Sequence, residues 1–174
     1  MLRQVARAAR LDRSVYTELY FDGAAVANAL LVVALYATLW GAGLLAAAGA
    51  FNLFALIQTV ILALFSWVVL TFAVFLMGSR VFGGRADFQK LLASTGFAHA
   101  PLLLLGPVLF VISLMGFDGL AIFVFLLLWA WFLVVLEVAV EQTMELPRQQ
   151  AWLTTVLGFA VWFGISLLLP GGPF

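Results

Sequence analysis

The chain has 174 residues, of which 66% are hydrophobic and 9% are charged, whereas soluble domains are about 45–50% apolar and about 25% charged. A soluble fold of this length could not bury so much apolar surface, so the composition excludes one and indicates an integral membrane protein. Its long unbroken apolar runs predict spanning helices and not the alternating strands of a barrel. Cysteine is absent, which excludes disulfides, thiol catalysis and thiolate metal sites.

Residues 1–22 form a polar segment that precedes the apolar runs. Its arginines follow one side of a predicted helix, and a more apolar stripe follows at residues 15–20; the arginines are Arg3, Arg7, Arg10 and Arg13. Amphipathic segments of this kind lie in the headgroup layer of a membrane. We therefore expect an amphipathic cytoplasmic segment that contacts membrane lipids. The alternative is a docking surface for a soluble protein partner.

Five apolar segments follow, and each is long enough for a helix that crosses about 30 Å of hydrocarbon, which takes about 20 residues. They cover about residues 24–49, 53–77, 91–115, 120–140 and 151–169. Glycines at 116 and 119 predict a tight turn after the third span, and Pro147 predicts a break before the fifth. The sequence thus predicts an all-α fold in which residues 23–174 form a single five-helix membrane domain.

The basic residues predict the orientation of these spans. Four of the eight precede the first span, and the others, Arg80, Arg85, Lys90 and Arg148, fall in the loops after the second and fourth spans. All eight would then lie on one face, which the positive-inside rule makes cytoplasmic. We expect a multi-pass protein of the cell membrane, of the bacterial inner type, with the N-terminus inside and the C-terminus outside.

A glycine-rich loop leads into the third span, and Asp87 is predicted to cap the helix that begins there. The segment reads Gly83-Gly84, then Lys90-Leu91-Leu92, then Gly96-Phe97-x-x-x-Pro101. It resembles the Yip1 domain family, in which a Gly-Tyr-x-x-x-Pro element follows a short Gly-Gly loop into the third of five spans. Phe97 stands where the family usually has tyrosine, which removes a hydroxyl group.

Two other regions agree with this resemblance. Arg10-Leu11-Asp12 is similar to the N-terminal segment of bacterial members, and Leu146-x-Arg148-x-x-Ala151 is similar to their entry into the last span. The likeness runs from about residue 5 to residue 169. It implies a membrane-organising or trafficking role through protein or lipid partners.

His99 is the single histidine of the chain, and it lies about 13 Å along the third span from Lys90 at 1.5 Å per residue. Ionisable residues inside a membrane are functional candidates by default. Alternatively, a neutral His99 hydrogen-bonds Ser94, Thr95 or a carbonyl group released where Pro101 breaks the helix. Pro101 would then kink the third span, and His99 would cap the kink.

Glu137, Glu141 and Glu145 recur every four residues and so share one helical face. One hypothesis is an ion-paired cytoplasmic rim, in which cations near the ends of other spans compensate these acids. The candidate cations are Arg80, Arg85, Lys90 and Arg148. The other hypothesis is a proton or cation route that leads from Glu137 to His99.

We expect a non-enzymatic protein, because the sequence holds no Ser-His-Asp set and no HExxH motif, and a single histidine leaves most hydrolytic mechanisms without a base. No cofactor, metal site or nucleic-acid partner is indicated. The alternative function is a small transporter, channel or lipid-translocating protein with a polar path through His99 and Glu137. A homo-oligomer is compatible with either function.

Overall fold

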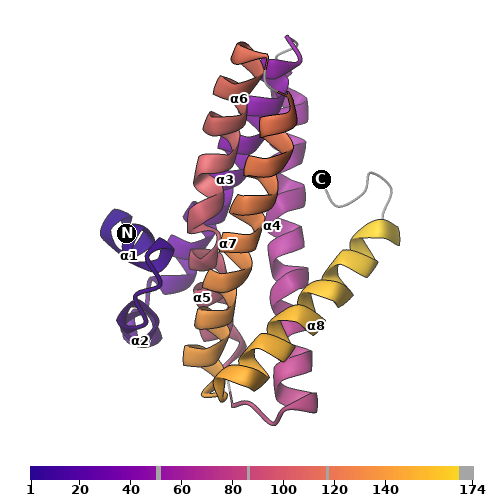
Figure 1. Cartoon of the computed structure of the whole chain (residues 1–174). Helices are drawn as coiled ribbons and strands as arrows, with labels where there is room; N and C mark the ends of the chain where they lie inside the picture. Colours follow the sequence, from indigo (N-terminus) through magenta and orange to yellow (C-terminus); the bar gives the residue numbers. More distant parts are fainter. Residues whose placement is uncertain (50–51, 86, 117, 169–174) are drawn as a thin grey trace.

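The computed structural model describes residues 1–49, 52–85, 87–116 and 118–168. Within these ranges every regular element is helical (Figure 1). Five of the described helical segments are long and apolar enough to cross a membrane: Ala25–Ala47, Leu53–Val81, Phe88–Met115, Gly119–Met144 and Arg148–Leu167. The all-α class and the five spanning helices predicted from the sequence are therefore confirmed. The predicted end of the fifth span at Leu169, and the tail after it, lie outside the described residues.

The first two α-helices precede the five spanning segments, and the described ranges contain eight α-helices and two short helices of other types in total. In chain order they are α1 (Leu2–Ala9), α2 (Ser14–Phe21), α3 (Ala25–Ala47), α4 (Leu53–Leu76), the π-helix η1 (Met77–Val81), α5 (Phe88–Ala98), the 3-10 helix η2 (Ala100–Leu104), α6 (Leu105–Met115), α7 (Asp118–Met144) and α8 (Arg148–Leu168).

Side chains at the ends of two helices explain where those helices start. Asn52 accepts hydrogen bonds from the backbone amides of Phe54 and Ala55 at the start of α4. Asp87 accepts one from the amide of Gln89, at 2.8 Å, so its predicted role as a cap of the third span is confirmed. That span begins three residues earlier than expected from hydropathy, because the cap and not the first apolar residue sets the start.

The third spanning segment is broken in the middle. Helix α5 ends at Ala98, the 3-10 helix η2 follows with Pro101 near its start, and α6 continues from Leu105. Proline lacks an amide hydrogen and its ring crowds the preceding turn, so the regular α-helical hydrogen bonds cannot continue through this point. Backbone hydrogen bonds between residues three apart, as in a 3-10 helix, replace the α-helical bonds at the break.

Helix α3 packs against α4, α5 and α6. Two glycines allow the close approach. A Cβ atom on Gly96 of α5 would meet the Cβ atom of Ala29, and one on Gly106 of α6 would collide with the backbone carbonyl of Leu39. In α3 itself, Gly43 faces the backbone of Gly106 in the same way. Glycines thus allow the helix backbones to approach each other closely where these helices cross.

Helix α8 is inclined to the other spanning helices (Figure 1). It packs against both α4 and α7, and Gly158 contacts Val74 of α4 where the two helices cross. Figure 1 shows that α8 then diverges from α4 and α7 toward its C-terminal end. The side of the bundle beyond this crossing is therefore covered less completely.

Helices α1 and α2 form a hairpin, here called the N-terminal hairpin, which lies beside the bundle and packs against α5 and α7 (Figure 1). Its apolar side is buried by the protein itself through Val5, Ala8, Val15 and Leu19. We expected this apolar stripe to face lipid, but the bundle covers it. Where the hairpin lies relative to the bilayer stays a prediction.

Candidate functional site

The Gly-Gly loop packs against the connection between α7 and α8. Gly83 has φ +70°, a left-handed conformation that favours glycine. The space beside Gly84 is filled by the side chain of Leu146, and the amide of Arg85 donates to the carbonyl of Met144 at 3.2 Å. Together these contacts close one end of the bundle.

The remaining motif residues lie inside the third spanning segment. Gly96 is the contact point with α3, Phe97 is fully buried, and Pro101 is buried in η2. A tyrosine in place of Phe97 would bring a hydroxyl group into this core and would need a buried partner for it. In this chain, Phe97 packs without that requirement.

His99 lies at the break, as the residue between α5 and η2. Its Nδ1 atom is 2.9 Å from the carbonyl oxygen of Thr95, one turn earlier. Because a carbonyl group only accepts, Nδ1 must be the protonated nitrogen in this contact. The ring is flanked by the aromatic rings of Tyr36, at 5.8 Å between centroids, and of Phe132, at 4.9 Å.

A polar cluster adjoins His99 on the α4 side. The indole of Trp67 donates to the hydroxyl of Thr95 at 3.1 Å, and the hydroxyls of Thr71 and Thr95 are 2.7 Å apart. All three side chains are buried between α4 and α5. The mid-span position of Trp67 is therefore explained by packing and hydrogen bonding between helices.

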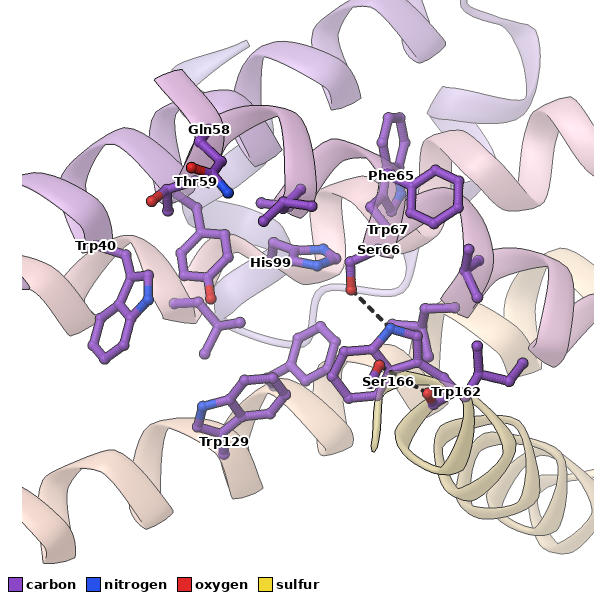
Figure 2. A pocket seen from close by; sticks show the side chains of 18 of the residues that line it. Trp40, Gln58, Thr59, Phe65, Ser66, Trp67, His99, Trp129, Trp162 and Ser166 are labelled. Carbon is purple, nitrogen blue, oxygen red and sulfur yellow. Dashed lines mark hydrogen bonds between the residues drawn. The ribbon is translucent and has the colours of Figure 1, made fainter. Parts of the chain in front are cut away.

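One edge of His99 faces a cavity of about 380 Å³. The cavity is bounded by α3, α4, η2, α7 and α8, and aromatic side chains form much of its wall. Figure 2 shows His99 in the middle of the lining side chains, with Trp40 and Trp129 on one side and Ser66 and Trp162 on the other. The indole of Trp162 donates to the hydroxyl of Ser66 at 2.8 Å, which joins α8 to α4 across the wall.

Sequence reasoning placed His99 in the membrane but missed this cavity. Its lining residues come from all five spanning segments, and several of them are apolar residues that no sequence pattern distinguishes from their neighbours. The one available signal was the presence of tryptophans in the middle of spans, where membrane-interface belts do not account for them. Trp67 and Trp129 both line the cavity.

Glu137 is buried in α7, with 2% of its side chain exposed. Its Oε1 atom has no hydrogen-bond partner within the described part of the chain, and the Nε atom of Arg148 is 4.0 Å away. Glu137 is not among the residues that line the cavity beside His99. The structure therefore brings Glu137 to Arg148 and does not join it to His99 through this space.

Glu141 has a partner that sequence reasoning did not name. An Nη atom of Arg13, at the start of α2, lies 3.0 Å from its carboxylate. The two residues are 128 positions apart, so no local pattern indicated the pair. With the hydrogen bond from the Trp131 indole to the carbonyl of Ala9, at 3.0 Å, this ion pair fixes the N-terminal hairpin to α7.

The basic residues divide into those that form ion pairs and those that face outward. Arg7 contacts Asp12 and Glu18 at 2.8 Å each, and it also donates to Ser14. Arg13 and Arg148 lie near Glu141 and Glu137, and Lys90 is half-buried near the start of α5. The exposed basic residues for which the structure records no ion pair in its described part are Arg3, Arg10, Arg80 and Arg85. In the described residues, no three His, Asp or Glu side chains form a group suited to a metal ion.

The contacts between Arg7 and Asp12 make the stability of the hairpin depend on pH. Hydrogen bonds from Ser14, and then from Arg7, lower the pKa of Asp12 from its ordinary value near 4 to about 2. Because the folded-state pKa is depressed, the stabilising contribution is complete above pH about 4 and is lost as the pH falls through about 2. We expect the difference in thermal unfolding midpoint between the parent protein and Asp12→Asn to shrink across this window.

The control for this measurement is Glu145→Gln, which removes an exposed carboxylate near the same end of the bundle. It leaves the contacts among Arg7, Asp12 and Ser14 in place, so it reports changes with pH that do not depend on them. A constant difference for Asp12→Asn over the same pH window would contradict the assigned role of the Asp12 contacts.

These observations define a class: a polytopic, all-helical membrane protein with five spanning helices, a broken third span and a docked N-terminal hairpin. The family model for the Yip1 domain matches residues 4–169, and the chain belongs to this family. The match includes the Gly-Gly loop, the break at Pro101 and most of the hairpin. Comparisons with curated proteins and with solved structures give no significant match.

Proposed function

We propose that this Yip1 family protein is a non-enzymatic membrane organiser, which gathers anionic lipids at the N-terminal hairpin on the cytoplasmic side of a bacterial inner membrane. The observation that carries the proposal is that two of the hairpin arginines form ion pairs and the other two are exposed. Arg7 and Arg13 hold the hairpin together and fix it to α7, and this leaves Arg3 and Arg10 exposed.

The apolar side chains that remain exposed on the hairpin support a lipid partner. Leu2 is 75% exposed and Phe21 is 82% exposed. Because the hairpin lies along the side of the bundle, we expect these two side chains to enter the acyl region while the arginines reach the phosphates. Each basic residue near an anionic surface contributes about 1 kcal/mol.

The positive-inside rule supports the cytoplasmic assignment. The hairpin is tied to Glu141 in the last turns of α7. The loop that carries Arg85 packs against the end of the same helix, at Met144 and Leu146, and Arg80 precedes this loop in η1. Arg13, Arg80 and Arg85 thus lie near one end of the bundle, whereas α1 with Arg3 lies further along its side, where it contacts α5 and η2. A transport path through His99 and Glu137 has less support, because the cavity beside His99 does not contain Glu137.

The experiment measures lipid selectivity in proteoliposomes with spin-labelled phosphatidylglycerol and phosphatidylcholine. The parent should favour the anionic lipid. Arg3→Gln with Arg10→Gln should reduce the ratio by up to about thirtyfold, because about 2 kcal/mol of attraction is lost. The double variant Arg80→Gln with Arg85→Gln removes the same charge away from the hairpin and should have a smaller effect.

Two results would contradict the proposal. An unchanged selectivity ratio in the hairpin variant, together with loss of a crosslinked soluble binder from intact membranes, would assign the hairpin to a protein partner. An ion flux through the parent protein that is abolished by His99→Ala and by Glu137→Gln would support the transport alternative.

A further inference from the structure

The cavity beside His99 opens at the side of the bundle. Several of its lining residues are also exposed on the outer surface of α4 and α8, namely Gln58, Leu62, Phe65 and Ile165. All four lie within helices that are long and apolar enough to span a membrane. The entrance therefore faces the surrounding lipid, and a molecule dissolved in the bilayer could enter sideways.

The cavity is elongated along α4. Its lining runs from Ala55, near the start of this helix, to Leu70, which is about 22 Å at 1.5 Å per residue. A volume of about 380 Å³ lies within the range of small-molecule sites, about 300–1,000 Å³. It corresponds to roughly a dozen methylene-sized groups, if each takes about the 30 Å³ of a water molecule. The shape and size suit an apolar chain or a ring with a short chain.

His99 supplies the polar feature at the inner part of this space. Because Nδ1 carries the proton that is donated to the Thr95 carbonyl, the neutral ring has a lone pair on Nε2. In the described part of the chain, the hydrogen bond recorded for the His99 ring is the one through Nδ1, and the ring lines the cavity. A ligand that donates a hydrogen bond to Nε2 would be favoured, because the surroundings are largely apolar and a hydrogen bond is stronger where water is scarce.

The walls beside this acceptor are aromatic. Tyr36 and Phe132 flank the imidazole, and Trp129 and Trp162 stack with 6.1 Å between their ring centroids. Flat aromatic surfaces bind apolar groups over a large area, and the few polar groups among them set the orientation of a ligand. None of the described residues that line the cavity is an aspartate, glutamate, lysine or arginine. This composition disfavours a charged headgroup.

We propose that the cavity binds a neutral membrane lipid that carries a hydroxyl group on an apolar body, with the hydroxyl donating to Nε2 of His99. This site is separate from the anionic headgroups assigned to the N-terminal hairpin, and it does not depend on that assignment. The hydroxyl is the distinguishing feature, because an ether of the same shape can fill the cavity but cannot donate.

The test uses the full protein in proteoliposomes and a matched pair of probes, a brominated long-chain alcohol and its methyl ether. Bromine quenches tryptophan fluorescence at short range, and four of the six tryptophans line the cavity: Trp40, Trp67, Trp129 and Trp162. We expect saturable quenching by both probes, with the alcohol binding roughly fivefold to tenfold more tightly, as expected for one net hydrogen bond.

Three variants separate the contributions. His99→Phe keeps a flat ring but removes the acceptor, and it should abolish the preference for the alcohol while leaving ether binding in place. Ala63→Phe should fill the cavity and abolish saturable quenching by both probes. Ala130→Phe, on an exposed position of α7 that does not line the cavity, should leave both affinities unchanged.

Equal affinities of the alcohol and the ether for the parent would overturn the proposed hydrogen bond to His99. Quenching that is insensitive to Ala63→Phe would show that neither probe occupies the cavity. Absence of saturable quenching, together with a crosslink between two copies across Phe65, would show that a second copy of the chain covers the entrance instead. Because these probes are uncharged, none of these outcomes decides the anionic lipid selectivity of the hairpin.

Discussion

Replacement of Gly106 by alanine should destabilise the protein by about 2 kcal/mol or more, within the range for overpacking a closely packed contact. A Cβ atom at this position collides with the carbonyl oxygen of Leu39 and comes within 2.8 Å of the amide nitrogen of Trp40. Both are backbone atoms of α3, so rotation of a side chain cannot relieve the collision. Helices α3 and α6 would have to move apart, and contacts along their whole crossing would weaken.

The matched control is Gly164→Ala in α8, where a Cβ atom would meet nothing within 4 Å. Alanine is favoured over glycine in a helix by about 1 kcal/mol, so this variant should be unchanged or slightly more stable. Thermal unfolding in detergent, followed by tryptophan fluorescence, measures both. A Gly106→Ala protein as stable as the parent would show that the α3–α6 crossing has room to adjust.

The fold class followed from the sequence because hydrocarbon imposes a strong and local requirement. A spanning segment must satisfy its own backbone hydrogen bonds, so each long apolar run had to be a helix. The third span also carried its own breaking signal in Pro101, and Asp87 marked where the helix begins. Helix starts and breaks that depend on residues within one turn of the chain were therefore predictable.

The positions of helix ends were less predictable, since packing extends helices beyond the apolar run. Helix α7 continues to Met144, four residues beyond the predicted end of its span. Met144 is buried, and its side chain fills the space beside Gly78 in η1. Contacts of this kind join segments that are distant in sequence, and the hydropathy of a segment does not predict them.

The candidate site depended on such distant contacts. The cavity needs Trp40 from α3, Ser66 from α4 and Trp162 from α8 to meet around His99, and the sequence specifies none of these neighbours. The ion pair between Arg13 and Glu141 is a similar case. Sequence reasoning found the ionisable groups, but the partners of each group depended on how the helices pack.

Replacement of Glu137 by methionine should stabilise the protein by about 1–3 kcal/mol. The Oε1 atom is buried without a hydrogen bond in the described part of the chain, and its nearest cation is 4.0 Å away on Arg148, whose side chain is 70% exposed. A second acid, Glu141, lies one turn further along the same helix face and repels it. Methionine has a similar volume and removes an incompletely compensated charge, a change that is often stabilising in buried sites.

Glu141→Met is the matched control, because it makes the same substitution one turn away but removes the partner of Arg13 at 3.0 Å. It should loosen the N-terminal hairpin and leave the protein no more stable than the parent, and thermal unfolding of both variants in detergent measures the contrast. If Glu137→Met is instead destabilising, the carboxylate must hold a contact on which the fold depends. A stabilised Glu137→Met protein with altered lipid selectivity would indicate that the chain retains this buried acid for function, since groups that lower stability persist mainly where activity requires them.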